Sequence, residues 1–232
     1  MSDPLPVTEH MQTLVQQWET CADRRAAFLS CYLLMTRNML GSIDKGEFSD
    51  ALWVSRLLHR FADYYFDALT AYEQDSPTTP PVWRQAHNAT LQPGTQVLQH
   101  LMLGINAHIN YDLVLTLVDL LEPEWGQLSP EERERRHTDH CHVNDVISRT
   151  IDAVQDSIIE RFIPVMDIVD KLLGPIDELI VAQLLTHWRE DVWKHALQLL
   201  EACEPAEREC LRQQLEATAL QRAEAILSLL PG

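Results

Sequence analysis

Apolar residues recur at three- and four-residue intervals along almost the whole chain, and no convincing run alternates apolar and polar positions as a half-buried strand does. This spacing places the apolar side chains of each segment on one face of a helix. The pattern predicts helices over residues 8–21, 24–40, 47–73, 82–91, 95–121, 130–163, 177–203 and 207–230. We therefore predict an all-α fold, a bundle of about seven to nine helices around one central apolar helix.

Glycine, proline and capping residues mark where these helices begin and end. Gly41 has the place of a C-terminal cap for the second helix, and the proline-rich segment 75–81 breaks the chain after the third. Ser129, followed by a proline and two glutamates, is a strong helix start. Because the connections are short and no longer repeat recurs, we expect residues 1–232 to form a single all-helical domain with antiparallel neighbours.

The helix predicted over residues 95–121 is the most apolar of the set. Asp112 and Asp119 are its only formal charges, so we expect it to be central, with other helices packed on most sides. No window of the chain approaches the roughly 18 uncharged apolar residues of a membrane span, and we expect none.

The 35 acidic residues outnumber the 18 basic ones and give a formal net charge of −17. Such a surface repels phosphate backbones and anionic lipid, which argues against nucleic acid as a partner. The N-terminal residues lack the charged and apolar regions of a secretory signal. The five cysteines are dispersed and form no CxxC pair, which favours a reducing compartment. We expect a cytoplasmic protein.

Polar residues with regular spacing interrupt the most apolar helix. His100, Gly104, His108 and Asp112 are each four residues apart and lie along one stripe of that helix. The imidazole of His108 and the carboxylate of Asp112 can therefore reach one small volume, and such donors suit zinc or another divalent metal. The alternative is a metal-free hydrogen-bond network that fixes helix packing, since buried polar groups are costly unless they are paired.

Two further segments offer candidate ligands. Asp63 lies within the aromatic segment 61–66 of a core-like helix, where a carboxylate needs a partner such as a metal or a histidine. His140 can supply another ligand, whereas we expect His137 and His142 to be solvated. Another stripe at four-residue spacing is expected to be exposed surface: His187, Asp191 and His195.

These observations define one candidate site. The expected metal ligands are Asp63, His100, His108, Asp112 and His140. The residues expected to contact a substrate are Tyr64, Gly104, Asn106, Asn110, Tyr111 and Asn144. In the sharpest form of this prediction, Asp63 and His100 share one pocket with His108 and Asp112, shielded from solvent.

The string GINAHINYDL at residues 104–113 resembles a bacterial family known only as a domain of unknown function, whose hallmark is a GxNAHIxxDL helix. The resemblance extends from the segment around Asp63, past Trp83, to residues 140–144, roughly the middle half of the chain. It implies no assigned activity.

The same helix is more distantly similar to zinc-dependent phospholipases C and to single-strand nucleases of the same all-helical fold. Their helix reads approximately LGxxxHYxxDxxxPLH, and Leu103, Gly104, His108 and Asp112 match its first part. The terminal PLH is absent here, which puts part of the ligand set in doubt. The similarity implies a divalent-metal hydrolase, with His108 and Asp112 as the transferable ligands.

Two functions of different classes follow. The first is a metal-dependent hydrolase that acts on a small-molecule or lipid-derived substrate, with the metal lowering the pKa of a bound water. The second is a metal-free helical module that binds a small apolar ligand or a partner protein. The sequence contains no Gly-rich nucleotide loop, GxSxG or HExxH motif, so those enzyme classes are excluded.

Overall fold

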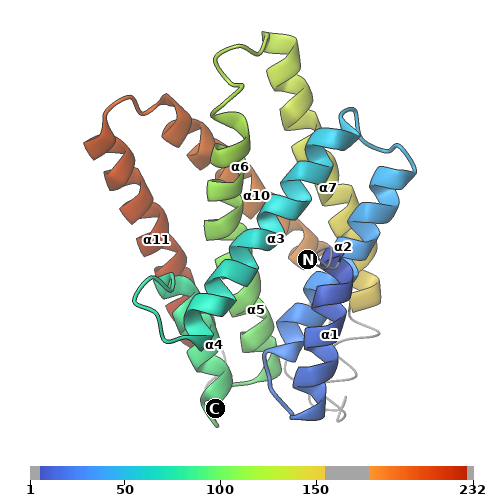
Figure 1. The fold of residues 1–232 in the computed structure, drawn as a ribbon, viewed down its shortest axis with the longest axis vertical. Coiled ribbons are helices and arrows are strands. Elements are labelled where there is room, and N and C mark those ends of the chain that lie inside the picture. The colour runs from blue at the N-terminus through green and yellow to red at the C-terminus, as the bar shows by residue number, and fades with distance from the viewer. Residues whose placement is uncertain (1–5, 155–177, 229–232) are drawn as a thin grey trace, which may run out of the picture.

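The computed structural model describes residues 6–154 and 178–228. Every regular secondary-structure element in these residues is a helix (Figure 1). The helices are α1 (Val7–Thr20), α2 (Ala26–Asp44), α3 (Ala51–Glu73), α4 (Pro81–Leu91), α5 (Val97–Ala107), α6 (Leu113–Leu121), α7 (Pro130–Val154), α10 (Glu178–Glu201) and α11 (Pro205–Ser228). A π-helical turn, η1 (His108–Asp112), joins α5 to α6. The predicted all-α fold is confirmed. The predicted continuation of α7 to residue 163 lies outside the described residues.

The rod formed by α5, η1 and α6 is the centre of the molecule. It contacts α2, α3, α4, α10 and α11, and Figure 1 shows it running between α11 on one side and α1 and α2 on the other. Among its apolar side chains, Leu103, Val114 and Leu117 are no more than 1% exposed. The expected central position is confirmed. The expectation that no window of the chain approaches a membrane span is wrong, because Val97–Leu121 is long and apolar enough to cross a membrane. However, 72% of its most apolar window is buried inside the protein, as in a core helix.

Two apolar cores lie along this rod, one at each end. Around α5, the first core gathers side chains of α1, α2, α3, α4 and α11, including Phe28 and Trp83. Around α6, the second core gathers side chains of α3, α7 and α10, including Trp53 and Trp188. The turn η1 lies between the two cores, so its polar residues are at the most enclosed part of the fold.

Local capping explains where the helices begin and end. The predicted end of α2 at Gly41 is wrong, because the helix continues to Asp44. Gly46, with φ of 72°, ends it instead. The amide of Gly46 donates to Ile43 O and that of Glu47 to Ser42 O, which is the glycine-dependent Schellman motif.

The starts of α3 and α7 are capped by side chains. Asp50 accepts a hydrogen bond from the Trp53 amide at 2.9 Å, which sets the start of α3 four residues later than predicted. The predicted start of α7 is confirmed by a capping box: Ser129 N donates to Glu132, and Glu132 N donates to Ser129 Oγ.

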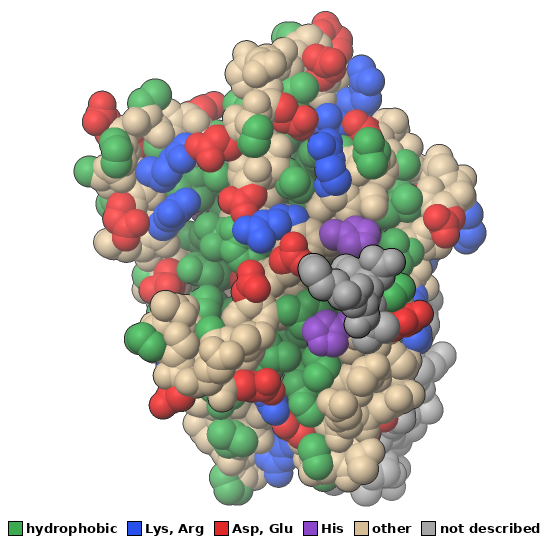
Figure 2. All heavy atoms as spheres, viewed as in Figure 1, with side chains coloured by type: hydrophobic (Ala, Val, Ile, Leu, Met, Phe, Trp, Pro, Cys, Tyr) green, Lys and Arg blue, Asp and Glu red, His purple; other side chains and the backbone are tan. Residues whose placement is uncertain are grey.

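The excess negative charge is not gathered in one patch on the face shown in Figure 2, where acidic side chains are scattered among basic ones. Several of these charges form ion pairs between helices, such as Arg60 with Asp119 at 2.7 Å and Arg208 with Glu122 at 2.6 Å. Because these pairs are exposed, each stabilises the fold by no more than about 1 kcal/mol.

Gly104 is a position where the fold has no room for a side chain. A Cβ there would overlap the ring of Phe28 and lie 2.9 Å from Phe28 Cβ. We predict that Gly104→Ala lowers the free energy of unfolding by about 1–3 kcal/mol, because the Phe28 backbone must shift to accept it. Gly41→Ala is the matched control, since nothing lies within 4 Å of its Cβ. In the interior of α2 it should stabilise by about 0.5–1 kcal/mol. Urea unfolding of both variants checks this, and equal effects would contradict it.

Candidate functional site

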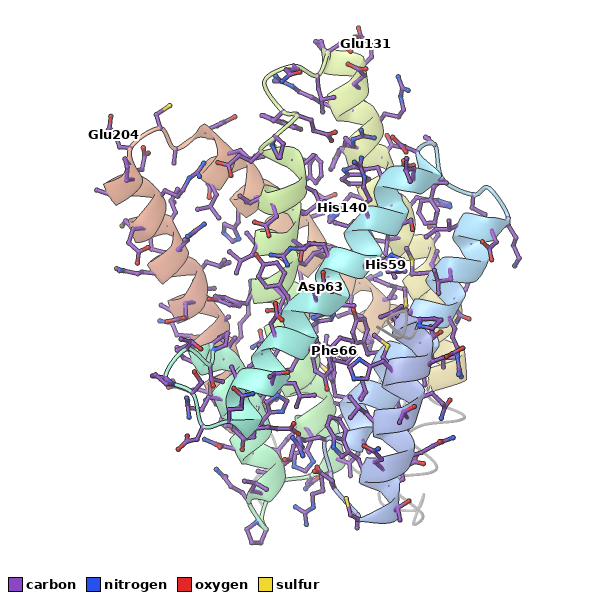
Figure 3. All side chains as sticks on the ribbon, viewed as in Figure 1. His59, Asp63, Phe66, Glu131, His140 and Glu204 are labelled. Carbon is purple, nitrogen blue, oxygen red and sulfur yellow. The ribbon has the colours of Figure 1, made fainter. Side chains whose placement is uncertain are left out.

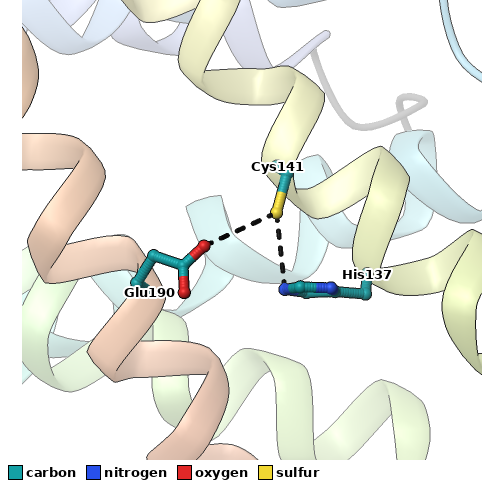
Figure 4. A group of neighbouring side chains, drawn as sticks. All are labelled: His137, Cys141 and Glu190. Carbon is teal, nitrogen blue, oxygen red and sulfur yellow. Dashed lines mark hydrogen bonds between the residues drawn. The ribbon is translucent and has the colours of Figure 1, made fainter.

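Three side chains with metal-binding atoms meet between α7 and α10 (Figure 4). His137 and Cys141 are one turn apart on α7, and Glu190 faces them from α10. Cys141 Sγ lies 3.4 Å from His137 Nε2 and 4.0 Å from Glu190 Oε1, and the three ligand atoms are all within 4.8 Å of one another. All three residues are half-buried. In the part of the chain that the structure describes, no other three His, Cys, Asp or Glu side chains converge in this way.

The donor set suits zinc. Thiolate sulfur, imidazole nitrogen and carboxylate oxygen bind Zn²⁺ at roughly 2.0–2.3 Å, which places neighbouring ligand atoms of a tetrahedron about 3.4–3.7 Å apart. The Cys141–His137 separation already has this value, and Glu190 Oε1, 4.0 Å from the sulfur, has to move closer to complete the set. Three protein ligands leave a fourth coordination position for water or a substrate, as in catalytic zinc sites.

The group does not have the geometry of a cysteine nucleophile. Burial raises the pKa of the Cys141 thiol, and the charge of Glu190 raises it further. An activated cysteine needs a lowered thiol pKa. In such a site, the carboxylate orients the imidazole of the histidine that activates the cysteine. Here Glu190 lies against the sulfur. A bound dication would neutralise this repulsion and deprotonate the thiol outright.

The residues next to the ligands clamp the two helices together. The Nε2–H of His140 donates to the backbone oxygen of Arg189 at 3.0 Å, and the Arg189 guanidinium donates to the backbone oxygen of His140 at 2.6 Å. Asn144 Oδ1 accepts from Arg189 Nε at 2.8 Å and orients the guanidinium. Because His140 precedes Cys141 and Arg189 precedes Glu190, these reciprocal bonds fix the backbone at the point where the candidate metal ligands face each other.

This clamp changes the roles expected for His140 and Asn144. Both nitrogens of the His140 ring face Arg189, Nε2 as a donor to the carbonyl and Nδ1 3.4 Å from the guanidinium, so neither is free for a metal ion. His140 lies on α7 behind α3 in the view of Figure 3. The predicted region is therefore close to the candidate metal group, but the ligand atoms belong to Cys141, next to His140, to His137, three positions before it, and to Glu190 on α10.

Sequence reasoning missed the group His137, Cys141 and Glu190. We expected His137 to be solvated, and this is wrong, since its ring lies 4.9 Å from that of Trp193 and is half-buried. The four-residue spacing of His137 and Cys141 was a usable signal. Nothing in the sequence indicates that Glu190, 49 residues after Cys141, faces them.

His108 and Asp112 form a buried pair inside an aromatic cage. His108 Nδ1 lies 2.9 Å from Asp112 Oδ2, and Trp83 Nε1 donates to the same oxygen at 2.9 Å. Phe61 stacks on the imidazole with ring centroids 3.5 Å apart, and Tyr32 meets it edge-on at 4.3 Å. The side chains of His108 and Asp112 are 4% and 1% exposed, so the predicted burial and pairing of these two residues are confirmed.

Burial decides the protonation of this pair. It raises the pKa of Asp112 well above 3.8, against the lowering effect of the Trp83 hydrogen bond, and it holds the pKa of His108 well below 6.5. Burial therefore favours the uncharged form of each partner. His108 Nε2 and Asp112 Oδ1 have no hydrogen-bond partner among the described residues. The pair lies in the π-helical turn, a rare conformation that is frequent at functional sites.

The other two predicted members of that pocket lie elsewhere. The prediction that Asp63 is buried beside His108 is wrong: its side chain is 62% exposed and 4.0 Å from Arg60. It lies on α3 in Figure 3. The helix presents Phe61 to the imidazole, and two residues further on the side chain direction has turned by about 200°. His100 is buried, but it lies about 12 Å along the rod from His108. Its Nε2 forms a hydrogen bond with the Thr95 hydroxyl at 2.7 Å.

The asparagines of the rod connect it to α11. Asn106 donates to the backbone oxygen of Ala219 at 2.8 Å, Asn110 donates to Asn106 at 3.0 Å, and Arg222 donates to Asn110 at 2.6 Å. Each of these hydrogen bonds joins two groups of the protein itself. This is the packing network that we gave as the alternative to a ligand site.

The remaining residues expected to contact a substrate do not enclose one. Tyr64 bonds to Asp119 on the surface, and Tyr111 is a partly buried packing residue. The cavity beside Gly104 and His100 has a volume of about 10 Å³, which is about the space one water molecule needs. Substrate contact by these residues stays a prediction.

The predicted relation to a family of unknown function is tested by comparison with known families. The family of unknown function DUF5995 matches residues 6–229. The chain belongs to this family. The match covers nearly the whole chain rather than its middle half. No curated protein and no solved structure matches significantly. DUF5995 membership therefore names a family but no activity, and the similarity to phospholipases C stays a prediction.

The buried pair predicts an unusual dependence of stability on pH. The raised pKa of Asp112 means that the folded protein keeps a proton that the unfolded chain releases above about pH 3.8. Wild type should therefore lose up to about 1.4 kcal/mol per pH unit relative to Asp112→Asn, from pH 4 upward to the folded pKa. Urea unfolding of both proteins between pH 5 and pH 8 measures the difference, in which titrating groups remote from the pair cancel. Parallel curves would contradict a protonated Asp112.

Proposed function

We propose that this protein binds zinc through His137, Cys141 and Glu190, and that the bound metal serves a hydrolase reaction on a small-molecule or lipid-derived substrate. The observation that carries the proposal is the convergence of three different zinc donors within 4.8 Å on two helices. A structural zinc site has four protein ligands, whereas three leave a position where water can bind. Zinc lowers the pKa of such a water and polarises a substrate oxygen.

The surroundings of the three ligands support this assignment over a random surface cluster. The clamp of His140 and Arg189 holds both backbones, so little order has to be gained when the metal binds. Trp193 packs against the ring of His137 and limits its orientation. The five cysteines are free thiols, which fits the reducing, cytoplasmic setting that we propose for a zinc–thiolate site.

Metal titration is the first test. Untagged protein stripped with a chelator should bind one Co²⁺ or Zn²⁺ ion. The cobalt form should show the near-ultraviolet thiolate-to-cobalt absorption of a Co–S bond. Cys141→Ser should abolish that absorption, and Glu190→Gln should weaken binding by at least about tenfold, because each removes an anionic ligand. Cys210→Ser is the matched control, since this exposed cysteine lies outside the group. It should bind metal like wild type.

Three results would overturn the proposal in whole or in part. Protein that binds no metal after reconstitution would favour the metal-free helical module, and binding that survives Cys141→Ser would place the metal elsewhere. Hydrolysis follows from the same preparations: zinc-loaded wild type should cleave a small phosphoester or ester that stripped protein and Cys141→Ser leave intact. Stoichiometric zinc without hydrolysis of any such substrate would leave a metal-binding protein and reject the hydrolase.

A further inference from the structure

Arg189 is a buried cation for which the described residues supply no ionic partner. It is 4% exposed, and no carboxylate of the described residues lies within 4.0 Å of its guanidinium. Its contacts are neutral: Asn144 Oδ1, the backbone oxygen of His140 and the His140 ring. Burying an arginine in this way is costly unless a nearby negative charge compensates for it.

The metal ligands are the nearest candidates for that compensation. Glu190 follows Arg189 in the chain, and Cys141 interacts electrostatically with the guanidinium. However, the charges of a thiolate and a carboxylate are both cancelled once they bind a dication, and the His137 ligand is neutral. The loaded centre with Arg189 then has one positive charge in excess. Glu134, the other carboxylate that acts on Cys141, is exposed, so water screens it.

We propose that the open position of this metal takes an anionic oxygen ligand, a carboxylate or phosphate oxygen of the substrate, and that Arg189 selects it by charge. The inference rests on the zinc centre proposed above and names its substrate class. Arg189 does not touch the ligand, because its side chain is buried and its Nε and one terminal nitrogen already donate to Asn144 and His140. It acts through the field at the metal, as a positioning and charge-setting residue.

The acidic surface and this local positive charge have different consequences. A net charge of −17 repels long polyanions, whose many charges interact with the whole surface. A small molecule with a single anionic group meets mainly the local field, which is strongest in a partly buried site of low dielectric. The combination fits a small anionic substrate and disfavours a nucleic acid.

The test uses full-length protein loaded with Co²⁺, whose visible spectrum reports the fourth ligand. Acetate and inorganic phosphate are titrated as anionic probes, and imidazole as a neutral one. Arg189→Gln, which removes the charge, should lower the affinity for acetate and phosphate by a factor at least about ten times larger than the factor by which it lowers the affinity for imidazole. Arg189→Lys should restore the preference for anions, and Asn144→Ala, which loosens the clamp but keeps the charge, should retain it.

The outcomes separate this inference from the zinc site itself. Protein that binds no cobalt rejects the metal centre and this inference with it. Cobalt-loaded wild type that binds imidazole but neither anion rejects the inference alone, and so does an unchanged anion preference in Arg189→Gln. If Arg189→Gln does not fold, wild type and Arg189→Lys decide: a spectral response to acetate or phosphate that exceeds the response to imidazole in both supports it, and an equal response overturns it.

Discussion

The cost of burying polar groups in the central rod governs much of this structure. A histidine and an aspartate in the middle of the most apolar helix cannot be left unpaired, and their hydrogen bond, with a second bond from Trp83 to the same carboxyl oxygen, meets part of that cost. To supply Trp83, α4 must lie against η1, and the rings of Tyr32 and Phe61 bring α2 and α3 to the same point. Three helices, α2, α3 and α4, are thus fixed around one buried pair between two apolar cores.

The same principle joins the remaining helices. Asn106 and Asn110 reach α11 through the Ala219 carbonyl and Arg222, and His140 with Arg189 joins α7 to α10. Apolar contacts are not directional, so they tolerate small shifts of one helix along another. Hydrogen bonds to specific atoms do not tolerate such shifts. These polar links therefore set the register that the cores leave open, and one result is the alignment of Glu190 with His137 and Cys141.

Two polar centres with different chemistry result from this arrangement. The pair of His108 and Asp112 lies among aromatic rings and has the character of a structural element, although two of its atoms lack hydrogen-bond partners in the described part of the chain. The group of His137, Cys141 and Glu190 is half-buried and keeps unused ligand atoms near the surface. For a member of DUF5995, a family without a known activity, accessibility together with ligand chemistry makes the second centre the place to look for function.

The sequence by itself determined the elements of this protein. Periodicity gave the helices and their central member, and the serine, proline and glutamate at residues 129–132 gave the start of α7, because these features depend on neighbours within a few residues. The four-residue spacing of His108 and Asp112 also sufficed to pair them, since one turn of a helix brings such residues together. Membership of a family of unknown function could be predicted from the string at residues 104–113.

Only the tertiary structure decided which residues meet across helices. The side of α3 that faces the rod depends on how that helix is rotated about its axis, and this rotation places partly buried Phe61 against the rod and leaves Asp63 exposed. The ring that fills the space over Gly104 belongs to Phe28 on α2, which lies 76 residues before Gly104 in the sequence. Glu190 reaches Cys141 only because α10 packs on α7 in one register. Contacts between distant segments leave no periodic signal in a single sequence, so the candidate metal centre could be found only in the fold.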